Sequence, residues 1–253
     1  MTPDDTAPAR PDVRHDAVVL AGGRASRLGG VPKPTVVLDG ATLLDRALAA
    51  ARDADRTVVV GPDPALPPGR DVLVAREDPP FGGPVAGLDA GLRALDAASG
   101  GSAPPWVLVL AVDVPRAAEA VAPLRAAVGT TDGDLDGAYL VREGHAQWLV
   151  GLYRRDALRR ALDGLAASTG SRGATGLTGV PVRRLVAGLS CVEVPDVEAV
   201  SADVDTWDDL RRLTVGLHTG SHTVVAARAA TSPDHATTAP AAPHRQHRPG
   251  GYR

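Results

Sequence analysis

A glycine-rich segment near the start of the chain, residues 18–34, holds the residue types best suited to binding phosphate. An apolar run leads directly into four glycines, two arginines, a serine and a lysine. Glycine lets the backbone approach a ligand closely, and exposed backbone amides in such loops bind phosphate oxygens. Arg27 and Lys33 can add charged hydrogen bonds to a triphosphate. The segment indicates a phosphate-binding loop, with a merely flexible loop as the alternative.

Two common phosphate loops do not fit this segment. No glycine directly precedes Lys33 and no serine or threonine follows it, so the Walker pattern is absent. The spacing G-x-G-x-x-G does not occur here either. A kinase-like or dinucleotide-binding protein is therefore disfavoured.

The elements that must position this loop are short apolar runs alternating with longer amphipathic stretches. Strands are expected at residues 17–20, 57–60, 72–75, 107–112, 138–141 and 148–153. Helices are expected at 43–51, 87–95, 116–128 and 156–166, with Thr42 and Asp45 as a capping pair for the first and Pro123 kinking or interrupting the third. Strands that are apolar on both faces are typical of a parallel sheet covered by helices. Residues 15–214 are thus predicted to form a single α/β domain, a three-layer α/β/α sandwich with a mostly parallel, Rossmann-like sheet, whose ligands bind beyond the carboxyl ends of the strands.

The composition limits the partners of this domain. Residues 1–14 are expected to form a flexible arm and residues 215–253 an unpatterned, disordered tail. A formal charge of −3 gives no general attraction to nucleic acid or to a membrane surface. Cys191 is the single cysteine, so an internal disulfide is impossible. With no apolar run long enough to span a bilayer and no secretory leader pattern, the sequence predicts a cytoplasmic protein.

Four segments resemble the signatures of one enzyme family. The pattern Leu20-Ala-Gly-Gly-x-x-x-Arg27-x-Gly29, followed by Lys33-Pro34, resembles the nucleotidyltransferases with a GT-A-like fold, and its double glycine is most similar to the molybdenum cofactor guanylyltransferases. Residues 77–87 are similar to the second nucleotide-facing loop of that family, residues 111–115 to its metal-binding strand end, and residues 202–210 to its C-terminal motif. The resemblance covers most of residues 16–213 in the expected order.

The resemblance implies a set of nucleotide contacts. They are Leu20, Ala21, Gly22, Gly23, Lys33, Gly61, Asp78 and Asp113. Asp78 would accept hydrogen bonds from a guanine edge, although an exposed loop acid is the alternative. Gly61 would allow close backbone approach, or it simply ends a strand.

The resemblance also implies catalytic roles for Arg27, Lys33 and Asp113 and a Mg²⁺ site. Asp113 follows the apolar run at 106–112, at the sheet edge expected for the glycine loop, although it could instead cap the next helix. Asp205 is the candidate second carboxylate and Asp203 its rival, since residues two apart on a strand share a face. Mg²⁺ needs only one or two protein carboxylates, because water and phosphate oxygens complete its octahedron.

The reaction implied is transfer of GMP from GTP to the phosphate of molybdenum-bound molybdopterin, with release of pyrophosphate. Transient contacts with other proteins of cofactor biosynthesis, or with target enzymes, would follow. A related transferase using CTP or another nucleotide, with a different cofactor or sugar-phosphate acceptor, and a catalytically silent nucleotide-binding module are the alternatives. His145 and Gln147 fall where the family faces its acceptor.

The sequence departs from the family pattern at several points. Val31-Pro32 precedes Lys33 where an aspartate is common, and Trp148 and Trp207 replace prolines. Aspartates occupy the asparagine positions of the last motif. These departures bear on the choice of base and acceptor more than on nucleotidyl transfer itself. His218 and His222 have a spacing that could bind a metal, but they lie in the unpatterned tail.

Overall fold

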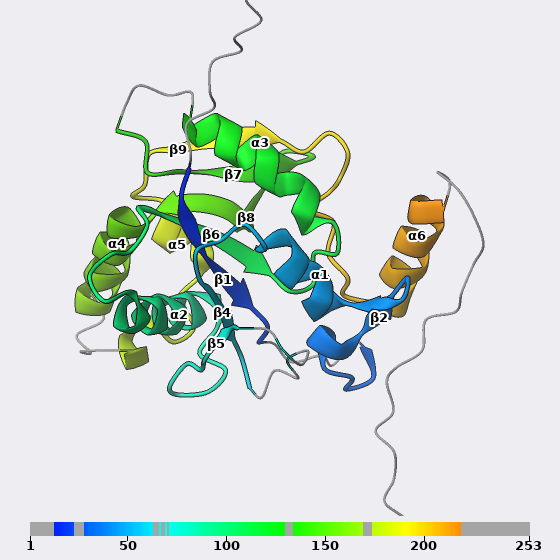
Figure 1. Cartoon of the computed structure of the whole chain (residues 1–253), viewed down its shortest axis with the longest axis horizontal. Helices are drawn as coiled ribbons and strands as arrows, with labels where there is room; N and C mark the ends of the chain where they lie inside the picture. The colour runs from blue at the N-terminus through cyan, green and yellow to red at the C-terminus, as the bar shows by residue number, and fades with distance from the viewer. Residues whose placement is uncertain are drawn as a thin grey trace, which may run out of the picture.

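A seven-stranded sheet forms the centre of the computed structural model, which describes residues 13–22, 28–62, 66, 69, 71–129, 134–168 and 174–218. The strand order across the sheet is β5-β4-β1-β6-β8-β7-β9 (Figure 1). The strands are β1 (His15–Leu20), β4 (Thr57–Val60), β5 (Leu73–Ala75), β6 (Trp106–Ala111), β7 (Gly137–Arg142), β8 (His145–Arg154) and β9 (Cys191–Pro195). A separate two-stranded sheet pairs β2 (Val37–Leu38) with β3 (Ala41–Thr42).

Strand direction is parallel throughout the large sheet except at β8. The strand β1 pairs in parallel with β4 and β6, β4 with β5, and β7 with β9. Only β8 runs antiparallel to its neighbours, β6 and β7. A two-residue turn makes this reversal: Glu143 and Gly144 have φ angles of 52° and 76°, the left-handed backbone that tight hairpin turns require. The mostly parallel sheet is confirmed.

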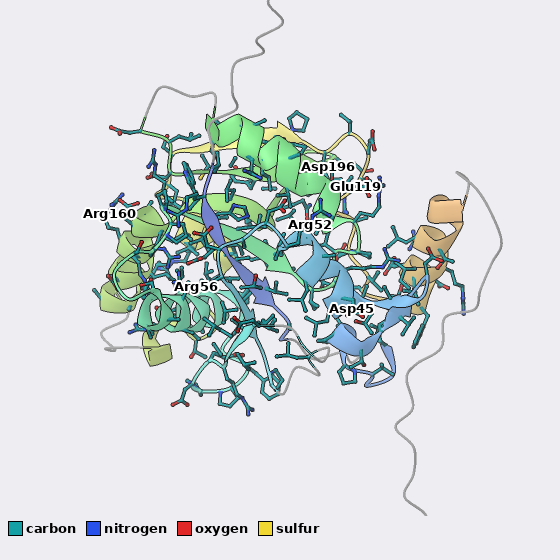
Figure 2. The ribbon with its side chains drawn as sticks, viewed as in Figure 1. Asp45, Arg52, Arg56, Glu119, Arg160 and Asp196 are labelled. Atoms are coloured by element: carbon teal, nitrogen blue, oxygen red, sulfur yellow. The ribbon has the colours of Figure 1, made fainter. Side chains whose placement is uncertain are left out.

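Helices cover both faces of the sheet. Successive residues of β1 point to opposite faces, and all of them are buried. Val18 belongs to the apolar cluster that includes residues of α2 (Pro84–Ser99), α4 (Arg155–Ser168) and α5 (Val182–Val186), whereas Ala17 belongs to the cluster that includes residues of α3 (Ala117–Gly129). The helix α1 (Leu43–Ala50) lies on the α3 side (Figure 1). In Figure 2, Arg160 on α4 and Glu119 on α3 lie at the outer surfaces of the two helical layers. The three-layer α/β/α arrangement is confirmed.

The expected strands and helices are all present, with shifted ends. Thr42 and Asp45 form the predicted capping box of α1: the Thr42 hydroxyl accepts from the Asp45 amide at 3.0 Å, and the Asp45 carboxylate accepts from the Thr42 amide at 3.1 Å. The expected interruption at Pro123 is absent, because α3 continues through it and buries Leu124 and its neighbours against the sheet. The loss of one helical hydrogen bond is offset by that burial.

The last described segment extends beyond the sheet. The helix α6 (Trp207–His218) packs Leu210, which is 2% exposed, into the apolar cluster beside α1. Of the two predicted flexible ends, 1–14 and 215–253, the structure describes only residues 13–14 and the final turn of α6. Within the part of the chain that is described, no helix is long and apolar enough to cross a membrane.

Candidate active site

The carboxyl ends of three neighbouring parallel strands, β4, β1 and β6, lie side by side. The Ala21 amide donates to the Val60 carbonyl at 2.7 Å, and the Val112 amide donates to the Leu20 carbonyl at 3.0 Å. The segments that leave β1, β4 and β6 therefore start from one rigid line of backbone. Loops at the carboxyl ends of strands are where open α/β sheets place their ligands.

An ion cluster lies at this edge. The Lys33 ammonium is 2.7 Å from the Asp113 carboxylate and 2.5 Å from the Asp205 carboxylate. The side chains of Lys33 and Asp113 are only 17% and 22% exposed. Burial acts to lower the pKa of Lys33, but the charges and hydrogen bonds of the two carboxylates outweigh it and raise the pKa. The lysine is therefore held fully protonated between two anions.

Local structure fixes each member of this cluster. Lys33 opens a 3₁₀ turn, η2 (Lys33–Thr35), and buried Leu28 and Val36 anchor the chain on either side of it. Asp113 is the second residue after the end of β6, and its carbonyl accepts from the Val204 amide at 2.8 Å. Val204 is fully buried, so this bond holds the following residue, Asp205, beside Asp113.

The two rival aspartates of the C-terminal motif have different partners. The segment 202–205 belongs to no strand, so the expected shared strand face does not exist. Asp205 contacts Lys33, whereas Asp203 lies 3.6 Å from the guanidinium of Arg142 at the end of β7. The structure thus places Asp205, and not Asp203, next to Asp113. Among the described residues, no group of three or more His, Cys, Asp or Glu is arranged to hold a metal ion.

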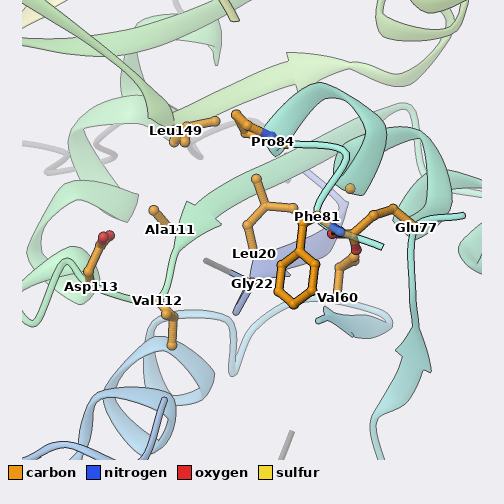
Figure 3. A pocket seen from close by; sticks show the side chains of 12 residues that line it. Leu20, Gly22, Val60, Glu77, Phe81, Pro84, Ala111, Val112, Asp113 and Leu149 are labelled. Atoms are coloured by element: carbon orange, nitrogen blue, oxygen red, sulfur yellow. Dashed lines mark hydrogen bonds between the residues drawn. The ribbon is translucent and has the colours of Figure 1, made fainter. Parts of the chain in front are cut away.

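A cavity of about 360 Å³ opens beside Asp113 (Figure 3). This volume falls within the range of ordinary ligand pockets. Its walls come from the ends of β1, β4 and β6, the loop before α2, the first turn of α2, and β8. The lining residues are Leu20, Gly22, Val60, Glu77, Phe81, Gly83, Pro84, Gly87, Ala111, Val112, Asp113 and Leu149. Most of these side chains are apolar, so the few polar groups decide what the cavity can bind.

The helix α2 directs its amino end at the cavity. Gly83 caps it with φ 92°, a conformation that favours glycine, and Gly83 and Pro84 both line the wall. A side chain at Gly87 would approach Leu20 within 3.2 Å, so glycine there lets the helix sit close against β1. The partial positive charge of a helix amino end favours an anionic ligand.

A family model described as the MobA-like NTP transferase domain matches residues 17–185 of this chain. The chain belongs to this family. The matched region contains the cavity, Lys33 and Asp113, whereas Asp205 lies beyond it. The protein is thus a nucleotidyltransferase, and the predicted family is confirmed.

Curated relatives of this transferase are named molybdenum cofactor guanylyltransferase. The protein from Acidiphilium cryptum is 38% identical over 154 residues, which cover 58% of this chain and 72% of the relative. The protein from Burkholderia lata is 36% identical over 143 residues, which cover 51% of this chain and 64% of the relative. The second match therefore spans less than two thirds of that relative's length.

Solved structures share the fold of the transferase at lower identity. The molybdopterin-guanine dinucleotide biosynthesis protein A from Archaeoglobus fulgidus is 21% identical with a TM-score of 0.56, covering 81% of this chain and 99% of that one. A nucleotidyl transferase from Methanothermobacter thermautotroptrophicus is 24% identical with a TM-score of 0.59, covering 82% and 99%. These likenesses establish the fold alone.

The predicted nucleotide-binding and catalytic residues of the transferase divide into four groups. Leu20, Gly22 and Asp113 line the cavity, and Lys33 contacts Asp113. Ala21 lies directly behind that wall. Gly61 lies there too: a side chain on Gly61 would come within 3.0 Å of the Ala21 backbone. Asp78 is exposed and is not among the lining residues. Gly23 and Arg27 lie outside the described residues.

Other residues singled out in the sequence are not among those that line the cavity. His145 is exposed, and its ring nitrogen is 3.0 Å from the Glu143 carbonyl; Gln147 donates to the His145 carbonyl at 3.1 Å. Both lie where β8 begins, near the carboxyl end of β7. His218 is the last residue of α6, and His222 lies outside the described residues. Burial raises the pKa of Cys191 to about 11, so its thiol is not an activated nucleophile.

Glu77 and Phe81 are among the lining residues that were not expected to contact the nucleotide. Glu77 directly precedes Asp78 and is 7% exposed, and Phe81 is 53% exposed. A signal was present for the second: Phe81 is the single phenylalanine of a chain that is only 3% aromatic. The one phenylalanine of the chain therefore stands in a loop rich in glycine and proline, a position that could have marked it as a candidate ligand contact.

Proposed function

We propose that this transferase moves GMP from GTP to the phosphate of molybdenum-bound molybdopterin and releases pyrophosphate. The names of its curated relatives support this donor and acceptor. The observation that carries the proposal is the Lys33–Asp113–Asp205 cluster at the mouth of a nucleoside-sized cavity. We place the reaction in the cytoplasm, consistent with a chain that has a single cysteine.

The two carboxylates fit a divalent cation. Asp113 and Asp205 both contact one ammonium, so their oxygens already converge on a single positive charge. Two carboxylates with waters and phosphate oxygens satisfy the octahedral preference of Mg²⁺. Bound there, Mg²⁺ would supply neutralisation of the charge that develops on the phosphate oxygens. Asp113 and Asp205 are the residues proposed to hold it.

The remaining residues bind and align the reactants. Lys33 and the backbone amides of the segment that leads to it are proposed to hold the triphosphate. An acceptor phosphate is already ionised at neutral pH, so its oxygen needs no general base. That oxygen attacks the α-phosphorus in line, a new phosphorus–oxygen bond forms, and the bond to the bridging oxygen breaks. Both electrons of that bond leave with pyrophosphate. Catalysis depends on positioning and charge stabilisation.

The decisive experiment measures pyrophosphate release with GTP, Mg²⁺ and molybdopterin-bound molybdenum as acceptor. Asp113→Ala should lower kcat by about 10³-fold, and Asp205→Ala by about 10²-fold, because each removes a charge that is fixed for the transition state. Asp203→Ala is the matched control: it removes an aspartate two residues away that pairs with Arg142 instead. Its rate should stay within about twofold of the wild type.

Three results would reject the proposal. Turnover unchanged in Asp113→Ala would remove the reaction centre from this edge of the sheet. Faster turnover with CTP than with GTP would assign the protein to a different donor. Nucleotide binding without pyrophosphate release, in the presence of the acceptor, would favour a silent binding module.

A further inference from the structure

Glu77 places a buried carboxylate at the wall of the cavity. It is 7% exposed, and its Oε1 accepts from the Phe81 amide at 3.1 Å. Across the described ranges, no lysine or arginine forms an ion pair with it. A buried carboxylate with one amide donor retains several free acceptor sites, since its two oxygens offer about four. The Glu77 carboxylate therefore offers the cavity hydrogen-bond acceptors that donor groups of a ligand can satisfy.

The position of Glu77 separates it from the phosphate-binding end. In Figure 3, Glu77 and Phe81 lie together on one side of the cavity, and Asp113 lies on the other. A side chain built on Gly22 would come 3.9 Å from the Glu77 Oε1, so this oxygen faces the start of the glycine loop. A nucleotide with its phosphates near Asp113 would extend its base toward Glu77.

Phe81 adds a flat apolar surface at the same side. Its ring is 53% exposed although it lines the cavity, and its backbone has φ 62°, a left-handed conformation that is strained for a bulky residue. The bond from its amide to Glu77 holds that conformation. Strained residues held by their surroundings cluster at ligand sites. An exposed ring beside an acceptor pair suits a planar heterocycle with N–H donors on one edge.

From this geometry we infer that Glu77, rather than Asp78, reads the guanine edge, and that Phe81 stacks on the base. This inference rests on the proposed function, since it assumes a guanine nucleotide in the cavity. Guanine carries adjacent donors at N1 and at the 2-amino group, which match the two oxygens of one carboxylate. Adenine and cytosine place an acceptor at the middle of that edge, so Glu77 would repel them. Asp78, being exposed, faces solvent.

The test measures binding of GTP and ITP by calorimetry without an acceptor. ITP lacks only the 2-amino group, so the ratio of the two affinities reports that single contact. Wild-type protein should bind GTP about 10- to 100-fold tighter than ITP, the range for a hydrogen bond to a charged group. Glu77→Gln keeps an acceptor for the Phe81 amide but loses the paired oxygens. Its GTP:ITP ratio should fall to about threefold or less. Asp78→Asn is the matched control and should keep the wild-type ratio.

Phe81 is tested by a different readout. Phe81→Ala should weaken GTP and ITP alike by about tenfold, because stacking acts on the whole ring and ignores the 2-amino group. Val74→Ala is its control, since Val74 is equally exposed at 53% but does not line the cavity. That variant should bind both nucleotides as the wild type does.

The outcomes separate this inference from the proposed function. GTP that binds tightly, with a GTP:ITP ratio unchanged in Glu77→Gln or reduced only in Asp78→Asn, overturns the inference and leaves the proposed function standing. No binding of GTP to the wild type overturns both. If Glu77→Gln does not fold, the contact is tested on the wild type alone, by comparing its affinities for GTP and N1-methyl-GTP. Loss of affinity for N1-methyl-GTP supports the carboxylate contact, and equal binding of GTP and N1-methyl-GTP excludes it.

Discussion

Two clusters of charged side chains lie toward opposite ends of the parallel strands, and they differ in how their carboxylates are paired with cations. Near the amino end of β1, aspartates and arginines from β1, α2 and α4 form a continuous chain of ion pairs. In order of contact, the members are Asp16, Arg155, Asp96, Arg159, Asp89 and Arg93. Every carboxylate has a guanidinium partner, and the charges cancel.

The cluster at the carboxyl ends of the strands is arranged differently. One ammonium, that of Lys33, is shared by the carboxylates of Asp113 and Asp205, and Glu77 has no ion pair in the described part of the chain. Carboxylates that each have a guanidinium partner fix elements to one another, whereas a buried carboxylate without a cation, such as Glu77, retains capacity for a ligand. A hollow of about 630 Å³ beside the arginine chain is the larger of the two, but Arg155 and Arg159 in its wall are already paired. The pairing of the charged side chains, and not the cavity volume, therefore distinguishes the candidate active site from the arginine-lined hollow.

Replacing Lys33 is expected to have the largest effect on this comparison. Lys33→Met should lower pyrophosphate release by about 10²- to 10³-fold, because a positioned cation is lost. It should also remove the ammonium that competes with a cation for Asp113 and Asp205, so that Mn²⁺ binds without nucleotide about tenfold tighter than in the wild type. Electron paramagnetic resonance of free Mn²⁺ measures this directly.

The control for Lys33 is Arg142→Met, which removes a cation from Asp203 instead. That variant should leave Mn²⁺ binding unchanged. If the wild type already binds Mn²⁺ as tightly as Lys33→Met does, Lys33 does not compete with the metal ion for the two carboxylates.

Breaking the balanced cluster should affect stability and not chemistry. Asp16 is fully buried, and one of its oxygens has no hydrogen-bond partner, so Arg155 is its principal compensation. Arg155→Met should lower the free energy of unfolding by about 3 kcal/mol, the usual cost of leaving a buried charge unpaired. Urea denaturation measures the loss. Turnover per folded molecule should stay at the wild-type level.

A double variant shows how much of the lost stability comes from leaving the Asp16 charge buried without a partner. Asp16→Asn combined with Arg155→Met removes both charges and should recover a large part of the stability lost in Arg155→Met alone. A double variant no more stable than the single one would mean that Arg155 acts through packing and its bond to the Pro104 carbonyl.

The fold was predictable where both faces of a strand are buried. The strands β1, β4 and β6 read as continuous apolar runs because helices cover both sides of them. The strand β9 alternates polar and apolar residues at an edge and has no such run, so its pattern was too short to identify. The antiparallel direction of β8 depends on the Glu143–Gly144 turn and not on the composition of the strand.

The site was predictable as far as sheet topology and motif order reach. Lys33 and Asp113 are 80 residues apart, yet each follows a strand of one parallel sheet, so their meeting follows from the fold. The choice between Asp203 and Asp205 depended on the Val204–Asp113 backbone bond, which no local pattern encodes. Glu77 and Asp78 are adjacent acids, and only the loop geometry decides which one is buried.

Two glycines sharpen the contrast between site and scaffold. A side chain on Gly61 would lie 3.0 Å from the Ala21 carbonyl carbon and 3.1 Å from the Gly22 nitrogen, both backbone atoms beside the cavity. Gly61→Ala should cost about 2 kcal/mol and weaken nucleotide binding, because Gly22 must move. Gly164 in α4 has open space around it, so Gly164→Ala should stabilise by about 1 kcal/mol and leave binding unchanged. Thermal unfolding with and without GTP measures both. Equal binding by the two variants would show that the Gly61 contact does not shape the cavity.

The smallest expected effect is the pH dependence that Asp16 contributes. Burial raises the pKa of Asp16, and the nearby Arg155 guanidinium only partly opposes this. The folded state therefore binds more protons than the unfolded state between pH about 4 and the raised pKa. The stability that Asp16 contributes is present below about pH 4 and is lost as the pH rises through the folded pKa.

The matched variant isolates this contribution. Hydrogen bonds lower the pKa values of Asp156 and Asp209, so these groups act in the opposite sense and lose stability as the pH falls. They are common to both proteins and cancel in the difference between the wild type and Asp16→Asn. Relative to Asp16→Asn, the unfolding free energy of the wild type should fall by about 1 kcal/mol or less as the pH rises from about 4 to 7. A difference that moves in favour of the wild type would mean that Arg155 outweighs burial, and that the balanced cluster stabilises the ionised carboxylate outright.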